Sequence, residues 1–203
     1  MQTNRKGYYI TADGEKTELL PPIKGNKLLN VSNQNIKELV VPEGVETVSC
    51  DNNQLTSLIL PKGVEEVYCY NNQLTSFVLP EGVKIVWCFN NQLTSLELPE
   101  GVETVYCNNN QLSSLELPDG VKEVYCYNNK LTSLVLPNGI KHISCNNNQL
   151  TSLVLPEGIK EVFCKNNKLT SLKLPEGIQT VWCDIGVKLI NLNGKETEVT
   201  LYA

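Results

Sequence analysis

The sequence predicts a β-solenoid, in which short strands stack coil upon coil into one parallel sheet. Eight cysteines recur at a fixed step of 19 residues. Eight prolines keep the same step, from Pro42 to Pro175, and a glycine stands two residues after each of them. Apolar residues alternate over short runs, as strands require, and no stretch keeps the 3.6-residue period of a helix. Because one such unit cannot bury its own apolar face, stacking of neighbouring units is expected to build the core.

We number the repeat from 1 to 19, with residues 64–82 (VEEVYCYNNQLTSFVLPEG) as the reference unit. Apolar side chains fall at positions 1, 4, 6, 11, 14 and 16, and an asparagine stands at position 9. The pairs 4 and 6, and 14 and 16, each have the period of two that is typical of extended chain. A Pro-x-Gly turn closes the unit, which indicates that no helix joins one coil to the next.

The segment V-x-x-V-x-C-x-x-N-x-L resembles the L-x-x-L-x-L-x-x-N-x-L core of leucine-rich repeats. Seven units, from Val45 to Leu169, match this core with only Val, Ile or Cys in place of Leu. The rest of the unit, L-T-S-L-x-L-P-E-G, resembles the short bacterial repeats of type III-secreted effectors, although it is one residue shorter and lacks their first proline.

The resemblance implies one strand per unit, with positions 4 and 6 inside and positions 3, 5 and 7 outside. It also implies that the position-9 asparagines turn inward and pair with backbone groups that the bend leaves free. These residues are Asn53, Asn72, Asn91, Asn110, Asn129, Asn148 and Asn167. On the opposite, convex wall, proline cannot donate to a ladder, so we expect extended or polyproline-like chain, few or no helices and slight curvature.

Both ends of the chain are expected to be caps, because a bare solenoid end exposes core and strand edge. Residues 1–25 form the N-terminal cap, a hairpin with its turn at residues 12–15. Residues 26–183 form the solenoid, with one degenerate unit and about eight regular ones. Residues 184–203 form the C-terminal cap, and Asn193-Gly194 favours the type I′ turn of a second hairpin.

Composition excludes several classes of function. The 203 residues hold 17 Lys and Arg against 22 Asp and Glu, and no basic run suits a nucleic-acid partner. No apolar stretch is long enough for a membrane span, and no signal peptide is visible at the start. We therefore expect a cytoplasmic protein, or one exported without a cleaved signal.

The periodic cysteines are expected to form a column inside the core. They are Cys50, Cys69, Cys88, Cys107, Cys126, Cys145, Cys164 and Cys183. Strands in register lie about 4.8 Å apart, which falls within the Cα range of a disulfide, but the Cβ vectors of a parallel ladder run side by side. We predict reduced thiols that pack as small apolar side chains, with disulfides or a metal as the alternatives.

The outward positions 5 and 7 carry nine of the chain's 13 aromatic residues. Exposed aromatic area is unusual on a monomer, and Tyr and Trp dominate binding energy at interfaces. The predicted partner-binding residues are Tyr68, Tyr70, Trp87, Phe89, Tyr106, Tyr125, Tyr127, Phe163 and Trp182, with Glu66 and Glu123 at the rim beside Lys84 and Lys122. The alternative is that the rings only stabilise the sheet through cross-strand pairs.

No catalytic or metal site is predicted. His142 and Ser144 are expected on one face with Glu123 and Glu161 nearby, but strand amides are used in the ladder and leave no oxyanion donors. The Asn-Asn pairs lack the carboxylates of a calcium loop. We expect a non-enzymatic scaffold without a cofactor that binds a protein or peptide, as a monomer or with weak self-association. Glycan binding, self-assembly and an engineered consensus array are the alternatives.

Overall fold

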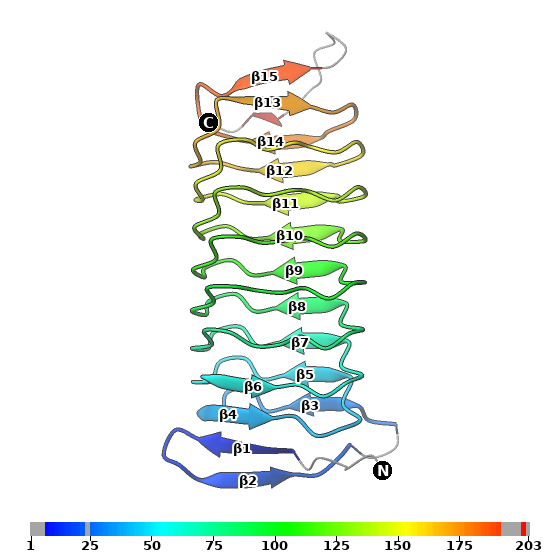
Figure 1. Ribbon diagram of the computed structural model, residues 1–203, viewed down its shortest axis with the longest axis vertical. Helices are drawn as coiled ribbons and strands as arrows, with labels where there is room; N and C mark the ends of the chain where they lie inside the picture. The colour runs from blue at the N-terminus through cyan, green and yellow to red at the C-terminus, as the bar shows by residue number, and fades with distance from the viewer. Residues whose placement is uncertain (1–6, 23–24, 192–199, 202–203) are drawn as a thin grey trace.

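The computed structural model describes residues 7–22, 25–191 and 200–201. Stacked coils form a long column in which the strands of one sheet follow one another from end to end (Figure 1). Within the described residues the elements are strands, turns and extended chain, with no helix. The predicted β-solenoid is therefore confirmed.

The main sheet has 10 strands, in the order β16-β14-β12-β11-β10-β9-β8-β7-β5-β3. Neighbouring strands are parallel, and from β3 to β14 the partners lie one repeat apart, as Val86 and Val105 do. The strands are β3 (Leu28–Asn30), β5 (Thr47–Ser49), β7 (Glu66–Tyr68), β8 (Ile85–Trp87), β9 (Thr104–Tyr106), β10 (Glu123–Tyr125), β11 (His142–Ser144), β12 (Glu161–Phe163), β14 (Thr180–Trp182) and β16 (Thr200–Leu201).

The core lies between this sheet and the opposite wall. The middle residue of each regular strand, such as Val105, is buried, and so are the position-6 cysteine and the position-11 leucine that follow it. Cys107 is 0% exposed while its neighbour Tyr106 lies on the outer face, which fixes the register as predicted. All eight cysteines are free and buried. Each packs as a small apolar side chain between its neighbours in the column.

The position-9 asparagines form the expected inward ladder. Asn110 is representative: its Nδ2 donates to the carbonyl oxygens of Cys88 and Cys107 at 3.0 and 3.1 Å. Its Oδ1 accepts the backbone N–H of Leu93, in the preceding coil, at 2.9 Å. One side chain thus pairs three backbone groups that the bend after the strand would leave without partners.

A second asparagine ladder, which the sequence did not predict, runs along position 8. These residues have positive φ, for example 53° at Asn90 and 55° at Asn109. Asparagine tolerates this left-handed backbone better than most side chains do. Their side chains also pair between coils, because Nδ2 of Asn109 donates to Oδ1 of Asn90 at 2.7 Å. The repeated Asn-Asn dipeptide is explained by two different tasks at adjacent positions.

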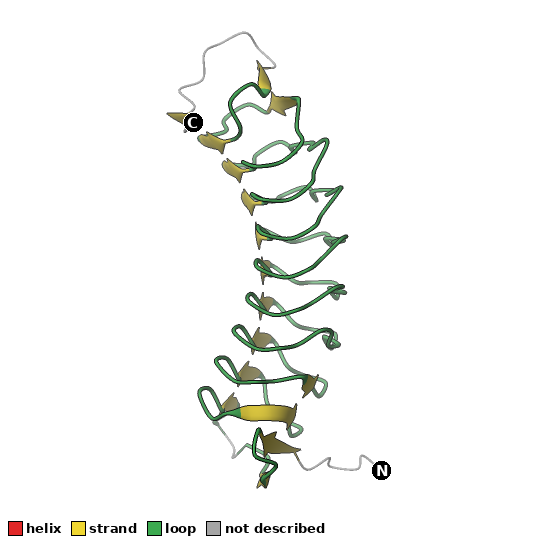
Figure 2. Ribbon diagram, turned by 90° about the vertical axis from the view of Figure 1, so that its left-hand side faces the viewer, coloured by secondary structure: helices red, strands yellow, loops and turns green. Residues whose placement is uncertain are grey.

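The opposite wall is extended chain that forms ladders only near the two ends of the array. There β4 (Ile36–Val40) pairs with β6 (Ser57–Ile59), and β13 (Ser171–Leu174) pairs with β15 (Lys188–Asn191). Between these pairs the wall has no regular strand, as expected where proline removes a donor in every coil. Figure 2 shows an array that is nearly straight over its middle and bends gently near its C-terminal end, so the predicted slight curvature is confirmed.

The N-terminal hairpin is present as predicted. β1 (Gly7–Thr11) pairs antiparallel with β2 (Lys16–Leu19) around a turn in which Thr11 Oγ1 contacts Asp13. On its other side β1 pairs antiparallel with β4. The hairpin therefore covers the first coil on the opposite wall, at the blue end of the column in Figure 1.

The C-terminal segment differs from the expected hairpin. The Asn193-Gly194 turn lies outside the described residues, but the strands that flank it do not pair with each other. Instead β15 runs parallel to β13 and β16 runs parallel to β14, on opposite walls. The partner of Leu172 is Leu189, only 17 residues later, because a turn with Gly186 at a φ of 97° shortens the path. The segment adds an irregular coil, since parallel pairing satisfies the open edges of β13 and β14.

Candidate functional site: the aromatic strand face

The strand face is built by three-residue strands whose middle side chain is buried and whose two outer side chains, at positions 3 and 5, face outward. Position 7 follows two residues later, before the chain turns at the positive-φ asparagine. This alternation comes directly from the pleat of a strand. Because coils stack in register, equivalent side chains of neighbouring units lie beside one another in columns.

Six aromatic rings form one continuous group on this face, which we call the aromatic strip. The strip comprises Tyr68, Tyr70, Trp87, Phe89, Tyr106 and Tyr125. The Tyr68 ring meets Trp87 edge-on, with centroids 5.0 Å apart, and Tyr106 lies 5.1 Å from Trp87 on the other side. Tyr106 then stacks on Tyr125 at 4.3 Å. In the position-7 column Tyr70 stacks on Phe89 at 4.5 Å and contacts Trp87 at 6.4 Å.

The rings of the strip are half-buried, because they cover one another. Trp87 lies at the centre, with Tyr68, Tyr70 and Tyr106 around it. Its indole Nε1 is buried and has no hydrogen-bond partner, the one such side-chain atom in the described part of the chain. An unpaired buried donor of this kind costs on the order of 1–3 kcal/mol. The strip therefore holds one polar group that the fold itself does not satisfy.

The other predicted aromatic residues lie apart from the strip. Asn108, 4% exposed, occupies the position between Phe89 and Tyr127, so Tyr127 makes no ring contact with the strip. Farther along, Phe163 and Trp182 form a separate pair with centroids 5.9 Å apart. The small side chain of Ser144, 7% exposed, separates this pair from Tyr125. The nine predicted rings are thus divided into a strip, a neighbour and a distant pair.

Burial raises the pKa of three tyrosines of the strip, Tyr68, Tyr70 and Tyr106. Burial, and after it the neighbouring Tyr125 and Glu123, raises the pKa of Tyr106 to about 12. Burial, together with Glu66, also raises the pKa of Tyr68, whose hydroxyl donates to Glu66 Oε2 at 3.1 Å. Burial and then Asp51 raise the pKa of Tyr70. These hydroxyls are hydrogen-bond donors rather than charges at the edge of the strip.

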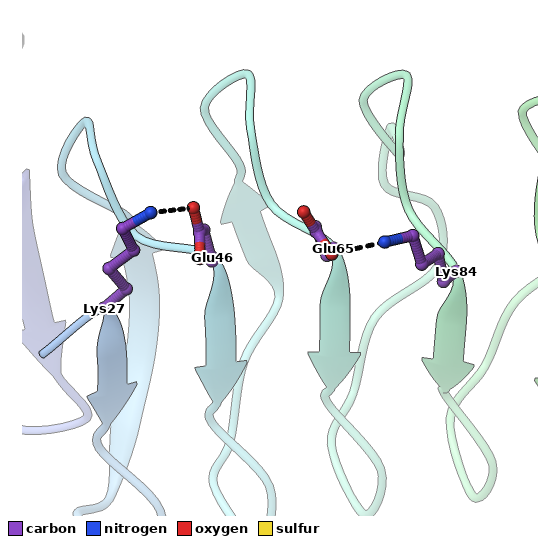
Figure 3. Close-up of polar contacts among 4 residues, drawn as sticks. All are labelled: Lys27, Glu46, Glu65 and Lys84. Atoms are coloured by element: carbon purple, nitrogen blue, oxygen red, sulfur yellow. Dashed lines mark hydrogen bonds and ion pairs between the residues drawn. The ribbon is translucent and has the colours of Figure 1, made fainter. Parts of the chain in front are cut away.

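A row of ion pairs lies at position 2, at the start of the strands. Lys27 pairs with Glu46, and Lys84 Nζ lies 2.6 Å from Glu65 Oε2 (Figure 3). Lys122 repeats this geometry with Glu103 at 2.5 Å. The lysine lowers the pKa of Glu65, and Glu65 raises the pKa of Lys84. These ion pairs are exposed and contribute little to stability. They do engage Lys84 and Lys122, the two rim lysines that were predicted to orient a partner.

His142 and Ser144 have separate partners. Nδ1 of His142 lies 3.1 Å from Oε2 of Glu161, in the next strand. The hydroxyl of Ser144 accepts a hydrogen bond from Asn146 Nδ2 at 3.1 Å. His142 and Ser144, which share one face and could suggest a hydrolytic triad, therefore bond to different partners and not to each other.

The fold and the outward columns of this chain define a leucine-rich-repeat scaffold, a class that typically serves protein–protein interaction. The chain belongs to the family described as the BspA type leucine rich repeat region, whose model of six copies matches residues 30–125, 64–163 and 104–184. A search of curated proteins found no match. No helix among the described residues is long and apolar enough to cross a membrane.

Two solved structures align with this chain at low sequence identity. The functional domain of InlJ from Listeria monocytogenes, described as including a cysteine ladder, aligns with a TM-score of 0.59 and 18% identity over 83% of this chain and 49% of that one. YopM from Yersinia enterocolitica WA-314 aligns with a TM-score of 0.49 and 17% identity over 81% and 49%. The chain thus spans about half the length of either structure. The InlJ likeness supports the fold.

Proposed function

We propose that the strand face binds a protein or peptide through the aromatic strip. The observation that carries this proposal is the grouping of six contacting rings around the unpaired indole donor of Trp87. An unsatisfied donor at the centre of the strip lowers stability, so it is not expected on a surface whose only role is to stabilise the sheet. If a partner causes the indole ring to rotate slightly, Nε1 of Trp87 can donate a hydrogen bond to that partner.

Rigidity is the second support. The backbone under the strip is fixed by ladder bonds on both sides of each strand, and the rings already pack on one another. Aromatic side chains held in this way lose little conformational entropy when a partner arrives, so more of the contact free energy appears as affinity. The mechanism is presentation of a preformed surface, without a chemical step.

Ring packing also stabilises the sheet, so the two roles must be separated by measurement. Each cross-strand aromatic contact contributes about 0.5–1.5 kcal/mol beyond area burial. A Trp87→Ala, Tyr106→Ala double variant will therefore lose some stability. The matched control is Phe163→Ala, Trp182→Ala, which removes the other ring pair on the same face.

The test first selects peptides that bind the full chain from a displayed random library. Binding of the enriched peptides to the two double variants is then compared at a temperature where circular dichroism shows that both variants are folded. We expect the Trp87, Tyr106 variant to lose binding at least tenfold and the Phe163, Trp182 variant to keep it. Equal loss in both variants, or unchanged binding in both, would contradict the proposal. A glycan array run in parallel decides whether the flat rings bind sugars instead.

A further inference from the structure

Two carboxylates frame the centre of the aromatic strip. Glu66 on β7 and Glu123 on β10 both stand at position 3, directly beside the column of rings. Between them the same column holds the uncharged Ile85 and Thr104. The two glutamates are three strands apart, a separation of about 14 Å at the usual spacing of strands.

The nearby cations are already engaged. On strands β7 to β10 and the residue before each, the described lysines are Lys84 and Lys122, and each lies in an ion pair with a position-2 glutamate. Figure 3 shows the Lys84 pair at the start of its strand. On β7 to β10 the position-2 row is therefore neutral, whereas Glu66 and Glu123 form no ion pair with any described residue and leave negative charge along the strip.

Rings beside carboxylates suit the side chains of lysine and arginine. Their aliphatic stems pack on aromatic faces, where the ring quadrupole attracts the positive head, and a carboxylate then accepts a charge-assisted hydrogen bond. The molecule uses this contact elsewhere, because Lys16 Nζ lies 3.9 Å from the centroid of Tyr8. At the distant ring pair, Nζ of Lys165 lies 5.9 Å from the centroid of the Trp182 ring. A lysine of the chain itself therefore already contacts that pair.

We infer that the partner of the aromatic strip is an extended peptide segment that runs along the array and carries two basic side chains four residues apart, with an apolar residue between them. This inference rests on the proposed function and adds the chemistry of the partner. An extended chain rises about 3.4 Å per residue, so four residues span about 14 Å, the separation of the two glutamates. Alternation places residues i, i+2 and i+4 on one side, where the middle one meets Trp87 and Tyr106.

The experiment measures fluorescence anisotropy of a labelled nine-residue peptide with Lys, Phe and Lys at its third, fifth and seventh residues and Ser or Gly elsewhere. Comparison peptides carry Gln in place of both lysines, or the two lysines side by side. We expect the spaced lysine peptide to bind the full chain at least tenfold more tightly than either comparison peptide, and to lose this advantage as salt rises.

Two charge-matched variants locate the effect. Glu66→Gln, Glu123→Gln should reduce affinity for the spaced lysine peptide about tenfold. Glu97→Gln, Glu116→Gln removes the same charge from exposed positions on the opposite wall and should change affinity less than about threefold. Both pairs of substitutions keep the size of the side chain. The amide oxygen that Glu66→Gln introduces can still accept the hydrogen bond from the Tyr68 hydroxyl.

The outcomes separate this inference from the function on which it rests. If peptides bind through Trp87 and Tyr106 with no preference for lysine, or equally in both glutamine variants, the inference is wrong and the proposed function stands. No binding of the spaced lysine peptide up to millimolar concentration also overturns the inference. If the lysine peptide binds Trp87→Ala, Tyr106→Ala as tightly as the unaltered chain, the strip is not the binding surface and both fail.

Discussion

At the scale of single residues, the adjacent asparagines at positions 8 and 9 determine how each coil turns. Position 9 faces inward and pairs three backbone groups, while position 8 takes the left-handed backbone that the turn requires. The resemblance to leucine-rich repeats was enough to predict the first role. The second role depends on φ, which a periodic sequence does not reveal, although recurrence of Asn at a turn was a usable signal.

Replacing Asn110 with Ala should destabilise the protein by about 1–3 kcal/mol. The substitution leaves the buried Leu93 amide without its acceptor, and one buried unpaired group costs on the order of 1–3 kcal/mol. The Cys88 and Cys107 carbonyls lose one of two donors each, because they also accept from Asn91 and Asn129. Urea unfolding followed by circular dichroism measures the effect. The neighbouring exposed residue supplies the control, since Gln111→Ala should change the unfolding free energy by less than about 0.5 kcal/mol. Similar losses in both variants would show that the ladder bonds contribute little.

At the scale of elements, the strand and its cysteine form the repeating core. Period two and the resemblance to leucine-rich repeats together predicted which side chains point inward, and a shift of one residue would expose every cysteine. It did not predict how the outward rings group, since that depends on the size of each neighbour. Ser144 and Asn108 are small beside bulky rings, and their burial divides the predicted surface into a strip, a neighbour and a pair.

Stability should fall as pH rises above about 9. Burial raises the pKa of the Cys107 and Cys145 thiols to about 12, whereas an unfolded cysteine titrates near 8.5. Below about pH 8.5 both states keep their protons and stability is constant. Above it only the unfolded chain releases them, so the unfolding free energy decreases up to the folded pKa, by at most about 1.4 kcal/mol per pH unit for each thiol.

Urea unfolding at intervals from about pH 7.5 to about pH 10.5, which brackets the pKa of an unfolded thiol, measures this slope. A Cys107→Ala, Cys145→Ala variant should show a shallower slope than the unaltered chain, because two of the titrating thiols are gone. The same slope in both proteins would assign the alkaline loss to other groups, such as tyrosine or lysine.

At the scale of the whole molecule, the array is a sum of coils that each contact only their neighbours. The fixed 19-residue step made this architecture predictable over most of the chain. The prediction failed at the C-terminal end, where Asn-Gly favours a local hairpin but parallel pairing of β15 and β16 with open strand edges prevails. The free energy gained from a favourable turn sequence is small compared with that of a ladder of backbone hydrogen bonds. The strand partners of such a segment are therefore set by its tertiary context.

Deletion of residues 140–158, one complete coil, should leave a folded array. The Val121 coil then joins the Ile159 coil with every ladder position in register, and the denaturant m-value should fall by roughly a tenth, in proportion to the surface lost. Deletion of only 140–149 cannot restore the register and should abolish cooperative unfolding. Guanidinium unfolding of both variants measures these outcomes, and a folded half-coil deletion would contradict the stacking argument.

The coil that contains Ser144 marks a boundary within an otherwise uniform surface. Removing it would place Phe163 beside Tyr125, so that the two ring groups could merge into one track that reaches Trp182. A molecule with this construction can alter the length of its contact surface by whole coils while its interior remains the same. The reach of the binding surface can consequently change with the number of coils while the kind of core that supports it stays the same.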